Sequence, residues 1–187
     1  MRKVKKNLLL IGGTGRNVGK TTLANEIIKK FSPQQRIIGL KVSTFRKNEN
    51  QFHGDHQMPS ETGFLITKED LRLKHKDTAT MVLAGAERAY YVQTTGDVIM
   101  KAYREFEKTE NKEGLPLICE SRGLISYIKP GLFLMIVDQE NMKDDSIKYI
   151  KYADRILYYK NGDLSNLMDL INDLSITNEG WALKSQK

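Results

Sequence analysis

LLLIGGTGRNVGKTT, residues Leu8–Thr22, joins a short apolar run to a glycine-rich turn, a lysine and two threonines. Glycines let the backbone bend around an anion so that successive N–H groups point inward. The N-terminus of the helix that follows adds a partial positive charge. This order predicts a loop that holds the phosphates of a nucleotide. A glycine-rich turn without a ligand is the alternative, and the strand–loop–helix context disfavours it.

The residue types in this loop have distinct expected roles. Lys20 would reach the β- and γ-phosphates, and the Thr21 hydroxyl would complete a Mg²⁺ shell. Thr14 stands where the usual pattern has glycine, and Gly13 lies one position earlier, so the loop is one residue longer or uses Gly15 differently. The residues expected to contact the nucleotide are Gly13, Thr14, Gly15, Arg16, Asn17, Val18, Gly19, Lys20, Thr21 and Thr22.

The composition is that of an ordinary globular protein. The chain has 187 residues, 40% of them hydrophobic, and the expected organisation is a single domain, 1–187. No segment is long and apolar enough to cross a bilayer, and the four-residue apolar run after the basic N-terminus is too short for a signal peptide. The one cysteine, Cys119, is expected to be a small buried strand residue, and a reducing cytoplasm is the expected location.

The net charge of +7 raises the question of a nucleic-acid partner. The basic residues are dispersed along the sequence, and no run of Arg or Lys carries interleaved aromatic residues. A nucleotide needs only a few of these charges, so nucleic acid is not favoured. No membrane partner is expected, and a homodimer is left open.

Apolar runs and helical periodicity alternate along the chain. The expected strands are Val4–Ile11, Arg36–Val42, Arg88–Gln93, Leu115–Cys119, Leu132–Val137 and Arg155–Tyr159. The expected helices are Gly19–Phe31, Lys74–Gly85, Asp97–Glu110, Asp144–Ala153 and Leu164–Leu174. This alternation predicts an α/β fold with a doubly wound, mostly parallel sheet and helices on both faces, and ligands at the carboxyl ends of the strands.

Two segments do not fit the alternation. Ser43–Asp70 is long and polar, and we expect either a lid over a ligand or a disordered surface loop. The segment from Ser175 is polar apart from Trp181 and predicts a C-terminal tail of open conformation.

An acidic residue at the end of a neighbouring strand is expected to hold Mg²⁺ or its waters. Glu120 and Asp138 both follow apolar runs. Glu120 is favoured because it leads into a tight turn, Ser121–Gly123, whereas Asp138 precedes a helix and has the alternative role of a cap. Arg122 either neutralises phosphate charge or is a solvated loop arginine.

Several short motifs, in order, resemble the SIMIBI class of P-loop NTPases. GTGRNVGKT at Gly13–Thr21 resembles the loop of dethiobiotin synthetase, G-T-x-x-x-V-G-K-T, which also has the extra residue. KDTATMVLAGA at Lys76–Ala86 is similar to the KDSxxLxxAGA segment of the molybdopterin-guanine dinucleotide biosynthesis protein B (MobB) family. CESRG at Cys119–Gly123 resembles the VEG of both families.

The resemblance implies a P-loop NTPase fold and roles for three further residues. Lys41 would lie near phosphate or substrate, Asp77 near the site and its metal, and Glu120 near Mg²⁺. Ser121 replaces the glycine usual in these families, and the residues after Lys41 read VSTF rather than a His-rich or Pro-containing run. MobB-like proteins carry His and Asp in the next loop, where this chain has His53, Asp55 and His56; a metal site and a merely polar loop are both open there.

The sequence gives only a weak indication of which nucleotide base the protein would bind. A GTP-binding protein usually has an Asp after the last strand that recognises the guanine. This chain has Lys160-Asn161-Gly162-Asp163 there, with Asn and Lys reversed from the usual order. Asp163 is therefore a candidate for base recognition, and a simple Asn-Gly turn with Asp163 as a helix cap is the competing interpretation.

The leading hypothesis is Mg²⁺-dependent binding and hydrolysis of ATP or GTP, or phosphoryl transfer, with Lys20 and Glu120 as catalytic residues. One alternative is a nucleotide-binding adaptor of MobB type that assists a partner enzyme in cofactor biosynthesis. Another is an ATP-dependent synthetase that acts on a small molecule, as in dethiobiotin synthetase.

Overall fold

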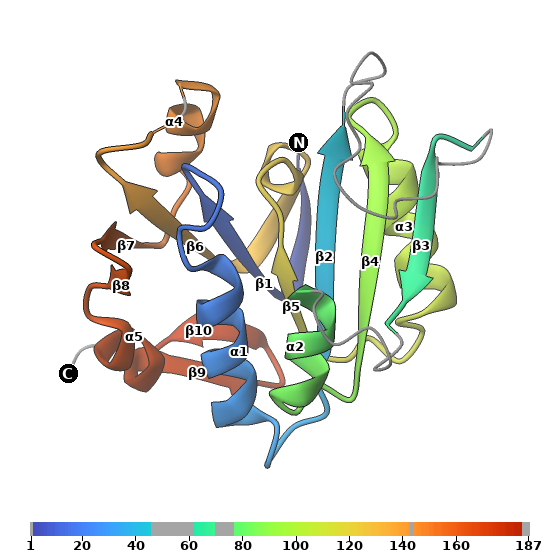
Figure 1. Ribbon diagram of the computed structural model, residues 1–187. Coiled ribbons are helices and arrows are strands. Elements are labelled where there is room, and N and C mark those ends of the chain that lie inside the picture. The colour runs from blue at the N-terminus through green and yellow to red at the C-terminus, as the bar shows by residue number, and fades with distance from the viewer. Residues whose placement is uncertain (1, 46–61, 70–76, 143, 185–187) are drawn as a thin grey trace.

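A computed structural model describes residues 2–45, 62–69, 77–142 and 144–184. Its centre is an eight-stranded sheet in the order β3-β4-β2-β5-β1-β6-β7-β8 (Figure 1). The strands are β1 (Lys3–Gly13), β2 (Ile38–Phe45), β3 (Phe64–Lys68), β4 (Arg88–Thr95), β5 (Leu117–Glu120), β6 (Ile128–Asp138), β7 (Arg155–Lys160) and β8 (Asp163–Leu164).

The pairing within this sheet is mostly parallel. β1 lies between β5 and β6, β2 between β5 and β4, and β7 beside β6, all in parallel. Only the two outer strands, β3 and β8, pair antiparallel with their neighbours. The predicted α/β fold with a doubly wound, mostly parallel sheet is confirmed.

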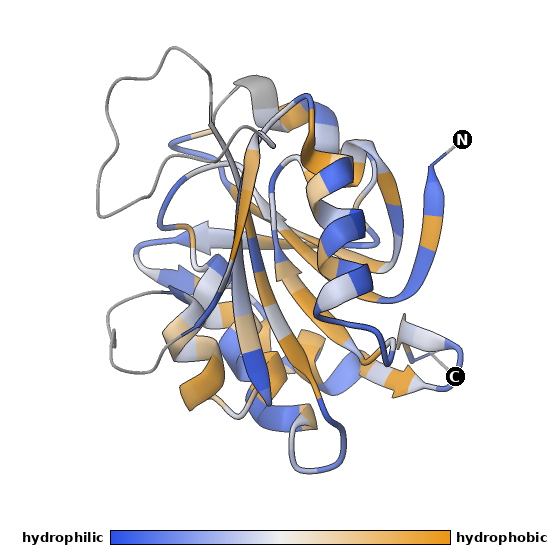
Figure 2. Cartoon of the chain, turned by 90° about the vertical axis from the view of Figure 1, so that its right-hand side faces the viewer, coloured by the Kyte–Doolittle hydropathy of each residue, from blue (hydrophilic) through white to orange (hydrophobic). Residues whose placement is uncertain are grey.

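Helices cover both faces of the sheet. They are α1 (Lys20–Phe31), α2 (Asp77–Leu83), α3 (Ile99–Thr109), the short 3₁₀ helix η1 (Leu124–Ser126), α4 (Asp144–Ile150) and α5 (Leu167–Asp173). Alternate residues of β1 show the division: Leu9 and Ile11 pack with α1, α2 and α5, whereas Leu8 and Leu10 pack with α3, η1 and α4. In Figure 2 the strands between these layers carry long stretches coloured as hydrophobic residues. No helix in the described ranges is long and apolar enough to span a membrane.

Two expectations about the elements need correction. Part of Ser43–Asp70, expected as a lid or loop, is strand: β2 extends to Phe45, and Phe64–Lys68 forms β3 against β4. Residues 46–61, with His53, Asp55 and His56, lie outside the described residues. The expected helix 164–174 begins only at Leu167, because Asp163 and Leu164 pair with β7 as β8.

The segment after Ser175 is not a tail. It forms an antiparallel hairpin of β9 (Leu174–Thr177) and β10 (Gly180–Leu183). Trp181 is 3% exposed, and its ring meets the Phe31 ring edge-on with 5.2 Å between centroids. Leu174 is buried with Trp181, and Ile176 and Leu183 pack partly buried against the same core, so a few apolar side chains anchor an otherwise polar segment.

Candidate active site

The glycine-rich loop connects β1 to α1 at the carboxyl end of β1. Asn17 and Gly19 both have left-handed backbone, with φ of 57° and 86°, within the bend that leads into α1 at Lys20. Gly13 leaves no room for a side chain, because a Cβ there would lie 2.8 Å from the Val18 side chain. Val18 is buried, while Arg16 and Asn17 are exposed at the outside of the loop. This tight loop at a helix N-terminus is the geometry that binds phosphate.

Lys20 folds back over the loop that precedes it. Its Nζ donates a hydrogen bond to the Gly15 carbonyl at 2.7 Å. The pKa of Lys20 lies below its ordinary value because burial penalises the ammonium, and the neighbouring Lys41 and Arg122 lower it further against the pull of Glu120 and Asp77. The ammonium therefore lies within the loop, where an anion would compete with the Gly15 carbonyl for it.

Glu120 ends β5, which lies directly beside β1. Its side chain is 3% exposed, and burial raises the pKa of the carboxyl, against the opposing effects of Lys41, the Thr21 hydroxyl and Lys20. The Thr21 hydroxyl therefore lies close to this carboxyl. The Oε1 oxygen of Glu120 is buried and has no hydrogen-bond partner in the described structure. A buried carboxylate oxygen without a partner is costly, and it marks a place for a cation or a water.

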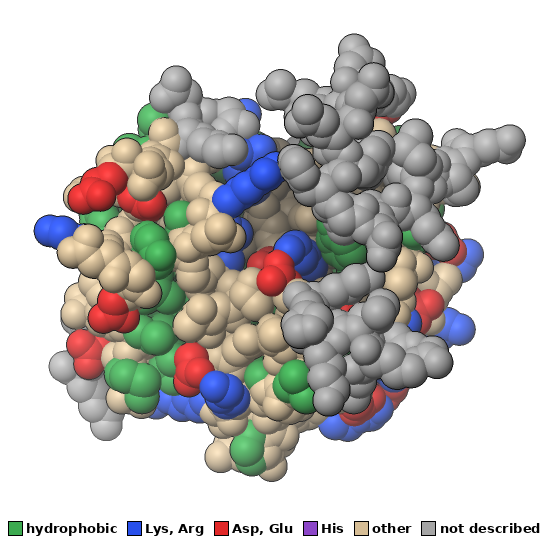
Figure 3. All heavy atoms as spheres, viewed as in Figure 1, with side chains coloured by type: hydrophobic (Ala, Val, Ile, Leu, Met, Phe, Trp, Pro, Cys, Tyr) green, Lys and Arg blue, Asp and Glu red, His purple; other side chains and the backbone are tan. Residues whose placement is uncertain are grey.

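Lys41 and Asp77 form an ion pair on the other side of Glu120. Lys41 lies on β2 and pairs in register with Glu120 of β5, and its ammonium donates to the Asp77 carboxylate at the start of α2. Burial works to lower the pKa of Lys41, but Asp77, Glu120 and Tyr91 together hold it above the ordinary value. In Figure 3, basic and acidic side chains meet in a hollow near the centre of this face.

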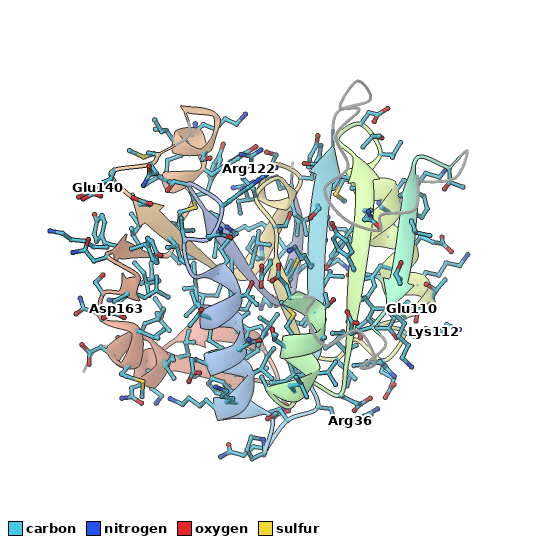
Figure 4. The ribbon with its side chains drawn as sticks, viewed as in Figure 1. Arg36, Glu110, Lys112, Arg122, Glu140 and Asp163 are labelled. Carbon is cyan, nitrogen blue, oxygen red and sulfur yellow. The ribbon has the colours of Figure 1, made fainter. Side chains whose placement is uncertain are left out.

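The structure thus brings together Lys20, Thr21, Lys41, Asp77 and Glu120, which are remote in sequence. Arg122 follows β5 and is close enough to influence the pKa of Lys20; Figure 4 shows it near the loop between β1 and α1. The hydroxyl of Ser121 accepts the Leu124 N–H at 3.3 Å, so the residue that replaces the usual glycine caps η1.

Thr14 holds the loop to the sheet. Its Oγ1 accepts the Asp138 N–H at 2.9 Å, its own N–H donates to the Ile136 carbonyl at 3.0 Å, and its carbonyl accepts the Ser146 hydroxyl at 3.3 Å. The side chain is fully buried. The contact that requires a hydroxyl is the one from the Asp138 N–H to Thr14 Oγ1, and it gives threonine a role in a position where the usual loop has glycine. Sequence reasoning missed this role, because the partners follow Thr14 by more than 120 residues.

Asp138 and Asp163 lie apart from the charged group around Glu120. The Asp138 carboxylate accepts the N–H groups of Glu140 and Asn141 in the turn after β6, so it does not cap the following helix, α4, which begins only at Asp144. Asp163 is exposed, and Figure 4 shows it at the β7–β8 side of the molecule, where it accepts the N–H of Leu164. It does not cap α5, which begins three residues after Leu164. The Leu164 side chain lies against Gly19, so this turn borders the loop.

Comparisons with known proteins add little to this geometry. No family model matches the chain, and no curated protein matches it. A solved structure that resembles it is the crystal structure of the "apo" form of LpxK from Aquifex aeolicus in complex with ATP, with a TM-score of 0.47 and 11% sequence identity. The match covers 85% of this chain and 50% of that one, so this chain spans about half the length of that protein. A likeness of this size carries no conclusion about function.

Proposed function

We propose that this protein binds a nucleoside triphosphate with Mg²⁺ at the loop Gly13–Thr22 and catalyses its hydrolysis or the transfer of its terminal phosphoryl group. The observation that carries the proposal is the convergence of Lys20, Thr21 and the buried Glu120 at the end of β1 and β5. Phosphoryl transfer depends mainly on positioning and on charge stabilisation, and these residues supply both.

The loop and Lys20 would hold the phosphates. In the free protein the Nζ of Lys20 donates to a neutral acceptor, the Gly15 carbonyl. A phosphate oxygen is a stronger acceptor because the bond is then assisted by charge on both partners. Binding would therefore transfer the ammonium from Gly15 to the nucleotide, where it stabilises negative charge as the phosphoryl group leaves.

Thr21 and Glu120 fit a Mg²⁺ site. Hard cations prefer oxygen ligands, and Mg²⁺ in nucleotide sites is held by few protein groups together with phosphate oxygens and waters. Glu120 Oε1 is buried without a partner beside the Thr21 hydroxyl, which suits such an ion or one of its waters. Bound there, Mg²⁺ would neutralise charge on the phosphates; Asp77, a further candidate ligand, is paired with Lys41 in the free protein.

Lys41 favours a second, anionic substrate as the phosphoryl acceptor. Lys41 lies in the middle of β2, in register with Glu120 and close enough to Lys20 to lower its pKa, and an anion could replace Asp77 as the partner of its ammonium. This is the synthetase-like alternative. In the adaptor of MobB type, which acts through a partner enzyme, unassisted hydrolysis would instead be slow. Single-turnover hydrolysis, alone and with a panel of small carboxylates and amines, separates these functions.

Substitution of Lys20 tests the proposal. Loss of a hydrogen bond to a charged group costs about 1.5–3 kcal/mol, so Lys20→Ala should weaken Mg²⁺–nucleotide binding by about 10- to 150-fold. Titration calorimetry with ATP and GTP measures this and identifies the base. Lys29→Ala is the matched control, because Lys29 is exposed on the same helix and pairs with Glu26. Equal affinities of wild type and Lys20→Ala for both nucleotides would contradict the proposal.

A further inference from the structure

A hollow of about 540 Å³ lies between the start of β1 and the second half of α3. It is lined by Lys3, Lys5, Asn7, Arg104, Glu107, Lys108, Asn111 and Gly114. The glycine-rich loop follows the opposite end of β1, so this hollow is separate from the candidate active site. Figure 2 shows the N-terminal part of the chain running beside a helix on this side of the sheet.

The tertiary structure concentrates positive charge here. Two lysines from β1 face an arginine and a lysine from α3, about 100 residues later in the sequence, and among the described residues Glu107 is the one carboxylate that lines the hollow. Lys3, Arg104 and Lys108 are exposed, so their ammonium and guanidinium groups are available to a partner. Such a concentration attracts an anionic partner and accelerates its association.

The position of Glu107 indicates where the acidic group of a ligand would fit in the hollow. Its carboxylate forms an ion pair with Lys5, and both side chains are 19% exposed. The amides of Asn7 and Asn111 are already bonded to the carbonyl of Leu115, at 3.0 Å and 3.2 Å. The cations are therefore the lining groups left to recognise a ligand, and one of them, Lys5, already pairs with the Glu107 carboxylate.

The spacing of the cations matches an extended acidic chain. Lys3 and Lys5 project from the same face of β1 about 7 Å apart, as alternate strand residues do. Arg104 and Lys108 are separated by one helical turn, about 6 Å along α3. Carboxylates on alternate residues of an extended peptide recur every 7 Å or so. In the part of the chain that the structure describes, no aromatic side chain lines the hollow, so these residues offer no stacking surface of the kind that binds single-stranded nucleic acid.

We propose that this hollow is a docking site for an acidic, extended segment of a partner protein with carboxylates at alternate positions. The segment lies between β1 and α3, and its carboxylates pair with Lys3, Arg104 and Lys108. One carboxylate competes with Glu107 for Lys5. The site acts independently of nucleotide binding at Lys20.

Fluorescence polarisation with a labelled peptide of alternating Glu and Thr tests the proposal on the full chain at low salt. The triple variant Lys3→Glu, Arg104→Glu, Lys108→Glu should bind at least about tenfold more weakly, because three attractions become repulsions. Its matched control is Lys29→Glu, Lys151→Glu, Lys160→Glu, which makes the same change in net charge at exposed residues that do not line the hollow. The control should keep most of the wild-type affinity.

Two further variants sharpen the test. Glu107→Gln removes the internal competitor and should bind the peptide several-fold more tightly than wild type. Lys20→Ala should bind it as wild type does, whatever its nucleotide affinity. Equal weakening of both triple variants would reduce the effect to net charge and overturn the site. Absence of peptide binding, or tighter binding of a single-stranded oligonucleotide through the same three cations, would overturn the proposed partner.

Discussion

The burial of Glu120 has a consequence for stability as a function of pH. Burial raises its pKa in the folded protein, so ionisation costs more in the folded chain than in the unfolded one. Well below the ordinary carboxyl pKa both states are protonated and there is no penalty. The cost of ionising Glu120 in the folded protein grows as the pH rises from the pKa of Glu120 in the unfolded chain to its pKa in the folded protein. Above the folded-state pKa the full cost is present.

Glu120→Gln should therefore be more stable than wild type at neutral pH without Mg²⁺, and this advantage should shrink as the pH falls toward 4.5, the ordinary value for Glu. Urea unfolding of both proteins at several pH values measures the difference. The same variant should lose the Mg²⁺ dependence of nucleotide affinity, since glutamine carries no charge for the cation. A stability difference that is independent of pH would contradict this account of Glu120.

Thr14 offers a second prediction for a single residue. Thr14→Val keeps the shape of the side chain but leaves the buried Asp138 N–H without its acceptor. An unsatisfied buried donor costs about 1–3 kcal/mol, and the free energy of unfolding should fall by that amount. Thr14→Ser, which keeps the hydroxyl, is the control. Equal stability of the valine variant and wild type would show that the contact with Asp138 contributes little.

Some helices and strands have a clear periodicity of apolar residues in the sequence, whereas others are held in place by only one or two buried residues. α1 and α3 were predicted to within two residues at each end, because their buried side chains recur at helical spacing. β3 and the hairpin of β9 and β10 are short and amphipathic, and their sequences carry little signal of their own. They form because a neighbouring edge or face is available, which sequence periodicity does not record.

Trp181 tests the hairpin as a structural element. The side chain is buried against Phe31, so Trp181→Ala should lower the free energy of unfolding by about 3–5 kcal/mol. Trp181→Phe should cost much less, because the ring contact is kept and Nε1 has no hydrogen-bond partner in the described structure. Circular dichroism follows the unfolding of both variants. A change within about 0.5 kcal/mol for the alanine variant would instead indicate an exposed residue.

For the whole molecule, the sheet order decides which charges meet. β5 lies between β1 and β2, so Glu120 stands between the loop that carries Lys20 and the strand that carries Lys41. The positive charge at the other end of β1 arises in the same way, since α3 crosses beside Lys3 and Lys5. The net charge of +7 is dispersed in the sequence but unevenly distributed in space.

The sequence alone determined the α/β class, the loop Gly13–Thr22 with its helix, and Glu120 as the favoured acidic residue. These features are local: glycine positions, apolar runs and helical periodicity act within a few residues of chain. The tertiary structure decided the contact of Thr14 with Asp138, the Lys41–Asp77 pair, the separation of Asp163 from the charged group, and the basic hollow beside α3. Each of these depends on contacts between residues far apart in the sequence, which only the packing of the sheet and its helices brings together.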